Sequence, residues 1–414
     1  MTRTVLAASA LLSSVALAQV TLSAPSPVTP SVSQEGQSQA RAVGTPTGFV
    51  VVWQAGVGRS AKVRAARLGL DGVSLDAAGL TIAEGTGGRF EPGVAFGHGV
   101  AFVVWSDLRD GQHAVYGARL DGTGQVLDVG GRKLSEAPGA RMADVAATPT
   151  GFLVAWAQAT ADGQGTEAWA RALGPDGTPL GPPVALTTAR PWTAGEDFGH
   201  WALQRAYAQQ VRVTVEGGLA FVAWAGNLGG SQDIRVGRAI LDAATGAVVV
   251  PADHAIPPTQ SRVWDPAVAG QGDGGVLISW TDFRGRGELG LPAHNAVLAS
   301  VDPQDAGVRQ LVAFKEDGGA RVVLRPTVSR AGVVAFVEGV QNPQRDRRTE
   351  WRVRVRRVDS TGASPGADVT LPEQAAWPYV TTGPTGVTLL VTTTVNAAGV
   401  DAGRLVSRIV TVPP

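Results

Sequence analysis

Five short apolar runs end in tryptophan: GFVVVW (48–53), VAFVVW (100–105), GFLVAW (151–156), LAFVAW (219–224) and GVLISW (275–280). Two further runs, GVVAFVE (332–338) and GVTLLVT (386–392), carry Phe336 and Val391 at the place of the tryptophan. The seven anchor positions are 53, 105, 156, 224, 280, 336 and 391, so the units are 51 to 56 residues apart, with one interval of 68. Such regular spacing indicates an internal repeat.

Each unit repeats the same parts around its apolar run. An opening segment such as RFEPGVAFG (89–97) precedes the run, and an alternating segment such as AVYGARLD (114–121) follows it. A glycine-bearing turn then leads to a closing segment such as GLTIAEG (79–85). Because runs such as that from Phe49 to Trp53 are apolar at every position, both of their faces must be covered. These features predict an all-β fold, a seven-bladed β-propeller of four-stranded blades.

The two ends of the chain complement each other. The seventh unit ends with its third strand, over residues 404–412, and has no fourth. Residues 28–53 align with residues 130–156, which places residues 28–33 where another unit has its fourth strand. We therefore expect residues 28–33 to pair with residues 404–412, closing the last blade and hiding two sheet edges.

A loop of the form W-x-D-x-R, followed by Y/W-[AG]-x-R-L-D-x-x-G, recurs along the chain, for example over residues 105–124. This motif resembles the repeats of exported bacterial β-propeller proteins, and the resemblance covers nearly all of the chain after its first residues. Units four to seven depart from it, because Asn227, Glu338 and Thr393 fall near the place of the aspartate. The resemblance implies the architecture and export, and it says little about activity.

Composition and the first residues suggest an exported single domain. The 414 residues are 44% hydrophobic and 17% charged, and their formal net charge is zero, so nothing favours nucleic acid or an anionic membrane surface as a partner. Residues 1–18 have the pattern of a secretory signal, with Arg3, an apolar stretch and the cleavage site Ala16-Leu17-Ala18. We expect mature protein to begin at Gln19, residues 19–414 to form one propeller, and no segment to insert into a membrane. The chain has no cysteine, which excludes disulfides.

Loop lengths indicate which face binds a ligand. The turns from first to second strand are short, whereas the loops from second to third strand are long and variable, as in TDFRGRGELGLPAHN (281–295). Variable loops on one face are typical of a binding face. The long interval adds an insertion over residues 189–210 on that face, and an alternative interpretation of it is a small helix over about 198–208 that plugs the channel. Its candidate ligand-binding residues are Trp192, Glu196, Asp197, His200 and Trp201.

A second group of candidate ligand-binding residues lies on the neighbouring rim: Arg262, Asp265, Asp282 and Arg284. Asp107 with Arg109, and Asp282 with Arg284, recur at one repeat position, which favours an ion pair or Asx-turn that holds the loop. Trp264 and Trp377 are assigned to a shared position, either in packing between blades or as a stacking platform. The histidines show no metal-ligand spacing, so neither a metal nor another cofactor is expected.

Three functions fit these observations. The first is an exported, noncatalytic binding or scaffold propeller that engages a glycan or a protein on its long-loop face. The second is a polysaccharide hydrolase or lyase that uses acidic residues at the channel mouth, such as Glu196 with Asp197 or Asp265 with Glu288. The third is a structural component of an envelope or matrix. We expect a monomer, and no catalytic motif distinguishes an enzyme.

Overall fold

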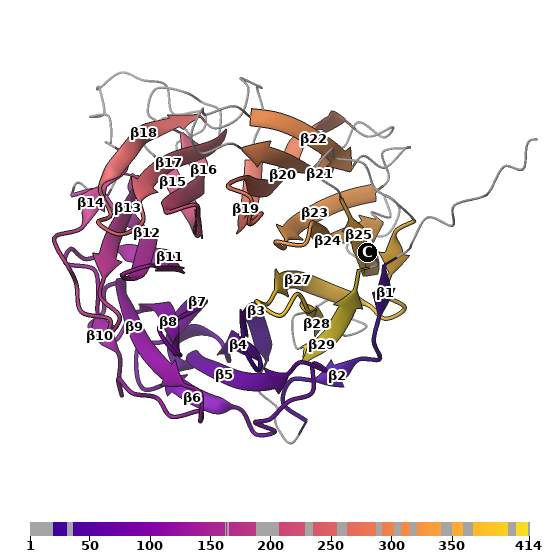
Figure 1. Ribbon diagram of the computed structural model, residues 1–414, viewed down its shortest axis with the longest axis horizontal. Coiled ribbons are helices and arrows are strands. Elements are labelled where there is room, and N and C mark those ends of the chain that lie inside the picture. The colour runs from indigo at the N-terminus through magenta and orange to yellow at the C-terminus, as the bar shows by residue number, and fades with distance from the viewer. Residues whose placement is uncertain are drawn as a thin grey trace, which may run out of the picture.

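The structure, a computed structural model, is a ring of seven β-sheets around a central channel (Figure 1). The sequence-based prediction of a seven-bladed propeller is therefore confirmed. Six sheets have four strands, and the seventh is completed by two short segments from the beginning of the chain. The structure describes residues 20–30, 36–161, 163, 165–187, 207–227, 235–254, 263–286, 292–301, 308–314, 321–340, 350–358, 367–395 and 403–412.

Within each blade the chain runs outward from the channel, strand by strand, and consecutive strands are antiparallel. A short 3-10 helix, η1 (Gly58–Ser60), lies in a loop of the first blade. The first three blades comprise β3 (Gln37–Thr45), β4 (Gly48–Ala55), β5 (Lys62–Gly69) and β6 (Leu80–Ala83); β7 (Arg89–Gly97), β8 (Val100–Asp107), β9 (Ala114–Asp121) and β10 (Arg132–Lys133); and β11 (Ala140–Thr148), β12 (Gly151–Ala159), β13 (Thr166–Leu173) and β14 (Val184–Ala185).

The other four blades follow the same order. They comprise β15 (Tyr207–Glu216), β16 (Leu219–Asn227), β17 (Arg235–Asp242) and β18 (Val248–His254); β19 (Val263–Gly270), β20 (Val276–Arg286), β21 (Pro292–Val301) and β22 (Val308–Phe314); β23 (Arg321–Val328), β24 (Val333–Val340), β25 (Glu350–Arg357) and β26 (Val369–Thr370); and β27 (Ala375–Thr382), β28 (Thr388–Thr394) and β29 (Leu405–Thr411) with β1 (Thr21–Leu22) and β2 (Ser26–Pro27).

The repeated apolar runs form the second strand of each blade, where they are covered on both faces. The tryptophan anchors in β4, β8, β12, β16 and β20 are at most 2% exposed, and Phe336 and Val391 occupy the same place in β24 and β28. Core clusters combine residues of neighbouring sheets, as Phe102 of β8 with Phe152 of β12, whose rings stack 4.9 Å apart. Packing between blades therefore supplies the continuous core that a single four-stranded sheet lacks.

The beginning of the chain closes the last blade, as expected, but with an earlier segment. Thr21 and Leu22 pair with Thr411 and Val410, and β2 pairs with β29 around Ser407. Of the expected segment 28–33, Val28 donates its N–H to the Leu405 carbonyl over 3.0 Å, whereas residues 31–35 lie outside the described part of the chain. The prediction was thus correct for the closure and for the contact of Val28, but the pairing segment begins seven residues earlier than expected.

Recurring ion pairs tie the third strands to the segments that follow them. The Arg67 guanidinium lies 2.7 Å from the Asp76 carboxylate, and Arg119 lies 2.8 Å from Asp128 at the equivalent place. The turns between third and fourth strands are held by aspartates: Asp121 Oδ1, for example, accepts the N–H groups of residues 123 and 125. The interpretation of these glycine-bearing segments as hairpin turns is therefore confirmed.

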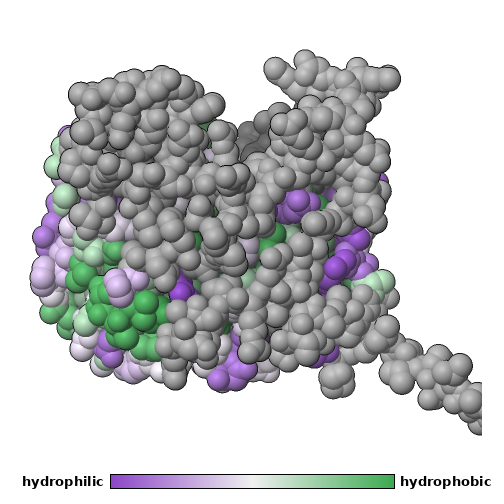
Figure 2. Space-filling view, turned by 90° about the horizontal axis from the view of Figure 1, so that it is seen from above, coloured by the Kyte–Doolittle hydropathy of each residue, from purple (hydrophilic) through white to green (hydrophobic). Residues whose placement is uncertain are grey.

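The outer wall of the ring mixes apolar and polar side chains, which lie next to one another in Figure 2. Val248 and Val249 of β18 are 38% and 54% exposed, as outermost strands of a propeller permit. Within the described residues, no helix has the length and apolar character needed to cross a membrane.

Candidate functional site

All seven innermost strands carry a β-bulge near their first residues. The pairing register with the second strand shifts there, for example between Ser38 and Arg41 and between Phe90 and Gly93. One residue in each bulge has a φ angle of 50° to 55°, a left-handed conformation that costs about 1 kcal/mol or more in a side-chain-bearing residue. We call these residues the bulge ring: Gln39, Glu91, Met142, Gln210, Asp265, Arg325 and Trp377.

The bulge ring lies toward the long-loop face. Gln37, at the start of β3, pairs with Ala55, where β4 ends and the loop to the third strand begins. The bulge follows two residues later, so its side chain is at the channel end that this face surrounds. The central channel has a volume of about 600 Å³ and is lined by residues of all seven innermost strands, including the whole bulge ring.

Side chains of the bulge ring reach from one blade to the next. Gln39 Oε1 accepts the N–H of Glu91 over 3.1 Å, and Glu91 Oε2 accepts the N–H of Met142 over 3.2 Å. The Met142 sulfur, a weak acceptor, lies 3.3 Å from the N–H of Gln210. In these three blades the backbone N–H of the bulge residue is thus bonded by a side chain of the preceding blade.

The contacts between bulge-ring side chains of neighbouring blades continue through the next three blades. Gln210 Oε1 accepts the N–H of Asp265 over 2.7 Å, and Gln210 Nε2 donates to Asp265 Oδ1 over 2.7 Å. Asp265 Oδ2 lies 3.8 Å from Arg325 Nε, and the Arg325 guanidinium stacks 3.3 Å from the centre of the Trp377 ring. The bulge ring is therefore a connected set of polar side chains around the channel mouth.

The bulge position is chemically diverse, whereas the first and third residues after it are uniform. The first residue after it is alanine, valine or proline in every blade, and the third is valine in six blades and alanine in one; the residue before the bulge position and the second residue after it vary from blade to blade. The bulge position itself carries two amides, two carboxylates, a thioether, a guanidinium and an indole. Six of these seven side chains carry nitrogen or oxygen atoms that can form hydrogen bonds, so the channel mouth presents a varied set of donors and acceptors.

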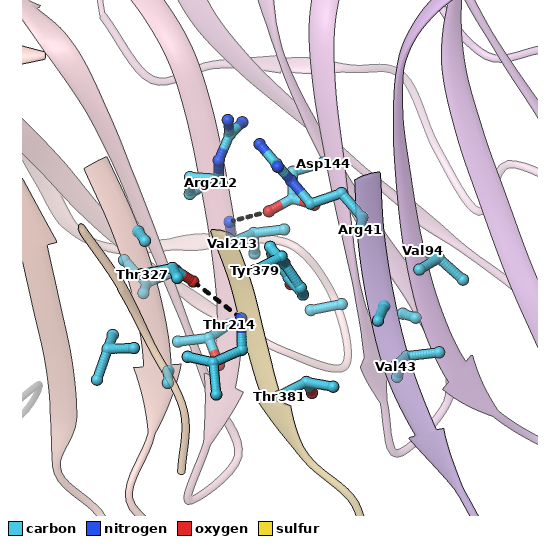
Figure 3. A pocket seen from close by; sticks show the side chains of 18 of the residues that line it. Arg41, Val43, Val94, Asp144, Arg212, Val213, Thr214, Thr327, Tyr379 and Thr381 are labelled. Carbon is cyan, nitrogen blue, oxygen red and sulfur yellow. Dashed lines mark hydrogen bonds between the residues drawn. The ribbon is translucent and has the colours of Figure 1, made fainter. Parts of the chain in front are cut away.

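A second set of side chains lies one step deeper, two residues after the bulge. We call it the arginine layer: Arg41, Asp144, Arg212 and Tyr379, which point into the same part of the channel in Figure 3. The Arg41 guanidinium lies 5.2 Å from the centre of the Tyr379 ring. Asp144 Oδ2 accepts the N–H of Val213 over 3.2 Å. The layer therefore combines two cations with one carboxylate and a phenol.

The two arginines repel each other in a partly desolvated space. Burial, together with the neighbouring Arg41 charge, lowers the pKa of Arg212 to about 10, although Asp144 opposes the shift. The group still carries its charge at neutral pH. Burial and the Asp144 charge raise the pKa of the Tyr379 phenol, so this residue is a neutral O–H at neutral pH.

Deeper still, most of the channel lining is apolar or weakly polar, and Glu216 and Arg330 line its far end. Thr214, Ser329 and Thr381 stand there beside Val43 and Ala95. Thr327, between these levels, bonds through its hydroxyl to the N–H of Val380 over 3.5 Å (Figure 3). Charged and amide side chains thus concentrate at the end of the channel that lies toward the long-loop face.

Only one of the residues expected from the sequence to bind ligand is described within this site, namely Asp265 of the bulge ring. Asp282 is 1% exposed on β20 and pairs with Val263, away from the channel lining. Arg284 also belongs to β20, but its side chain is outside the described part of the molecule. Five residues of the insertion and one on the rim lie outside the described residues: Trp192, Glu196, Asp197, His200, Trp201 and Arg262.

The end of the expected insertion is instead an innermost strand. Tyr207 to Gln210 begin β15, so the helix expected over about 198–208 is wrong at its last two residues, and its other residues lie outside the described ranges. Residues 207–210 pair with the end of β16. The fourth unit therefore has the same opening strand as the others, and Gln210 is its bulge residue.

The prediction that Trp264 and Trp377 occupy the same position of the repeat is also wrong, because they are offset by one residue. The bulge aligns Trp377 with Asp265, whereas Trp264 precedes the bulge and packs against the core between two blades. A slip of one residue moves a side chain to the other face of a strand. Trp264 therefore packs between blades, and Trp377 lines the channel.

The pair Asp107 and Arg109 holds its loop, as expected. Asp107 Oδ1 accepts the N–H of Arg109 over 2.9 Å, and the Arg109 guanidinium lies 2.6 Å from Asp107 Oδ2. The Trp105 indole donates to the same carboxylate over 2.8 Å, and Arg89 lies 3.2 Å away. Among the described residues, no group of three potential metal ligands occurs.

Most of the candidate site was missed from the sequence, including Gln39, Glu91, Arg41, Arg212 and Tyr379. A usable signal existed in the seven opening segments. Aligned on their recurring valine, which is alanine in the first unit, five of them carry an amide or charged residue three places before it. The bulge hid this signal, since it interrupts the alternation by which strand faces are assigned.

Comparison with known proteins gives similarity of fold alone. No family model and no curated protein matches the chain. A protein of unknown function from Dyadobacter fermentans is 12% identical, with a TM-score of 0.49, covering 95% of this chain and 99% of its own. An α-L-arabinanase from Penicillium chrysogenum is 10% identical, with a TM-score of 0.45, covering 77% and 92%; an endo-arabinase from Bacteroides thetaiotaomicron is 11% identical, with a TM-score of 0.40, covering 70% and 98%.

Proposed function

We propose that the protein is an exported, noncatalytic binding propeller that holds a glycan at the mouth of its central channel. One observation carries the proposal, namely that the bulge ring places a varied set of hydrogen-bonding side chains, all of them in the channel lining, at the channel mouth. Amides, carboxylates and guanidinium groups are planar and form paired hydrogen bonds, which suit the adjacent hydroxyls of a sugar. The channel volume of about 600 Å³ falls in the range of small-ligand sites.

The bonding of the two mouth carboxylates favours binding over catalysis. Glu91 Oε2 accepts bonds from the Ser106 hydroxyl and the N–H of Met142. Asp265 accepts a bond from Gln210 and lies beside Arg325. Both carboxylates are thus held in place by hydrogen-bond donors of the protein. Groups that position a ligand are held in the same way. Export is proposed from residues 1–18 of the sequence, and the partner is proposed to be a glycan in preference to a protein.

A glycan array with the mature protein, followed by titration calorimetry, tests this function. Gln39→Ala should weaken binding of any glycan retained on the array by about 10-fold or more, the effect of a lost binding contact of 1–2 kcal/mol. Gln125→Ala is the matched control, because Gln125 is an exposed amide on an outer turn. Glycan binding that is insensitive to Gln39→Ala, or no glycan binding at all, would contradict the proposal. Hydrolysis of a bound glycan would favour the enzyme instead.

A further inference from the structure

The two cations of the arginine layer are short of acceptors. Among the described residues, Arg41 donates from Nη1 to the Ala40 carbonyl over 3.1 Å, and Arg212 donates from Nη1 to the Val211 carbonyl over 2.8 Å. No ion pair within 4 Å joins either guanidinium to a carboxylate of this part of the chain. Each guanidinium has five N–H groups in a planar fork, so most of its donors face the channel without a described acceptor.

Several other arginines of the same fold are paired with carboxylates. Arg67, Arg109 and Arg119 each form an ion pair of 2.6 to 2.8 Å with an aspartate. The only carboxylate in the arginine layer, that of Asp144, accepts the N–H of Val213 and leaves the layer with one excess positive charge. A partly desolvated cation without a counter-ion is costly to keep. It is therefore an unusual choice for a position that serves packing alone.

We propose that the arginine layer binds the carboxylate of an acidic sugar residue that enters the channel through the bulge ring. This inference rests on the proposed glycan-binding function. Arginine matches a carboxylate in bidentate geometry, and two guanidinium groups that point into one space can clamp the two oxygens. The neutral phenol of Tyr379 stands beside them as an additional donor, and the Arg41 guanidinium is already oriented by its ring at 5.2 Å.

The surroundings favour an acidic sugar over a free inorganic anion. The arginine layer lies below a ring of amide, carboxylate and guanidinium side chains, which provides partners for several hydroxyl groups at once. A small anion such as phosphate would use the arginines and leave the bulge ring without a role. An acidic sugar uses both levels, its carboxylate below and its hydroxyls at the mouth.

Titration calorimetry of the mature protein with glucuronate, glucose and inorganic phosphate tests this assignment. We expect glucuronate to bind at least about 10-fold more tightly than glucose, and its affinity to fall by about 10- to 100-fold in Arg41→Met and in Arg212→Met, as for loss of a hydrogen bond to a charged group. Arg212→Lys keeps the charge and should retain part of the affinity. Arg330→Met is the matched control, because Arg330 lines the same channel at its other end.

Several outcomes would overturn the proposal. They are equal affinity for glucuronate and glucose, unchanged glucuronate affinity in both methionine variants, and an equal loss in Arg330→Met. Binding of phosphate without glucuronate would identify a free oxyanion as the ligand and refute the sugar. If neutral glycans bind in a way that depends on Gln39 while glucuronate shows no preference, the proposed function stands and this inference fails. If the mature protein binds no sugar at all, the proposed function itself is refuted.

Discussion

Replacing Arg212 by methionine should stabilise the unliganded protein. Folding lowers the pKa of this arginine from its ordinary value to about 10, so the folded state holds the charge less favourably than the unfolded chain does. At about 1.4 kcal/mol for each pH unit, a lowering of more than two units is roughly 3 kcal/mol. Because the side chain is only half-buried, solvent screens part of it, and we expect a gain of about 1 kcal/mol in the free energy of unfolding. Methionine keeps the unbranched stem that packs against the channel wall.

Urea unfolding of the wild type and the variant, followed by tryptophan fluorescence, measures this gain as a shift of the midpoint. The variant Arg67→Met is the matched control with the opposite sign. Arg67 pairs with Asp76 at 2.7 Å, and its removal leaves a partly buried carboxylate without its cation. We therefore expect Arg67→Met to lose about 1–3 kcal/mol, the cost of breaking a hydrogen bond to a charged group.

The effect has a defined pH dependence. Below pH 10, Arg212 is protonated in both the folded and the unfolded state, so the full cost is present. Between about pH 10 and the higher pKa of the unfolded chain, the folded protein releases the proton first, and the wild type becomes more stable relative to Arg212→Met as the pH rises. A variant less stable than the wild type by 1 kcal/mol or more at neutral pH would refute the reasoning, since it would mean that Arg212 has a stabilising partner in the protein.

Three further predictions concern the fold and export. Deleting residues 19–30 should lower the free energy of unfolding by about 3 kcal/mol or more, because it uncovers an edge of β29 and removes the buried side chains of Val20 and Val28; an unchanged thermal midpoint would contradict the closure. Burial raises the pKa of Asp107, but hydrogen bonds from Arg109 and Trp105 outweigh it and hold the pKa below its usual value. The contribution of the Asp107 carboxylate to the free energy of unfolding is therefore complete above about pH 4, and it is lost as the pH falls through the lower pKa of the folded state. Asp107→Asn should abolish this acid dependence and lower the free energy of unfolding by about 3 kcal/mol at neutral pH. Urea unfolding at several pH values measures both effects. Secreted protein should begin at Gln19, which N-terminal sequencing checks, and retention of residues 1–18 would count against export.

The architecture was predictable because the repeat has a strong sequence pattern, an apolar run at regular spacing. The run over residues 100–105, which forms most of β8, is apolar at every position, and only a doubly covered strand tolerates that composition. The closure was predictable only in outline. β1 and β2 have two residues each and show no alternation of their own, so alignment to another unit placed the pairing segment too late. The exposed edge of β29 selects its partner by backbone hydrogen bonds, which leave no hydropathy pattern.

The site was harder to predict because it depends on a local irregularity. A bulge adds one residue to a strand, so a periodicity of two assigns the wrong face beyond it. Asp265 was selected as part of a rim motif, without any indication that Gln210 contacts it through two hydrogen bonds of 2.7 Å. The insertion over 189–210 drew attention to tryptophans that lie outside the described residues, while its last residue, Gln210, belongs to the bulge ring.

Seven repeats in one chain provide an internal comparison of what the fold requires. Positions that the fold requires recur, as the buried tryptophan anchors do in five blades and the arginine–aspartate pairs do behind the third strands. The bulge recurs in the backbone of all seven blades, yet only Gln39 and Gln210 carry the same side chain there. A repeated backbone strain with a varying side chain separates two requirements: the bulge aims a residue at the channel, and under the proposed function the ligand determines which residue that is. Such a ring has no rotational symmetry, so a ligand bound by it has one orientation in the channel, and exchanging Gln39 with Glu91 should weaken binding although the composition of the ring is unchanged.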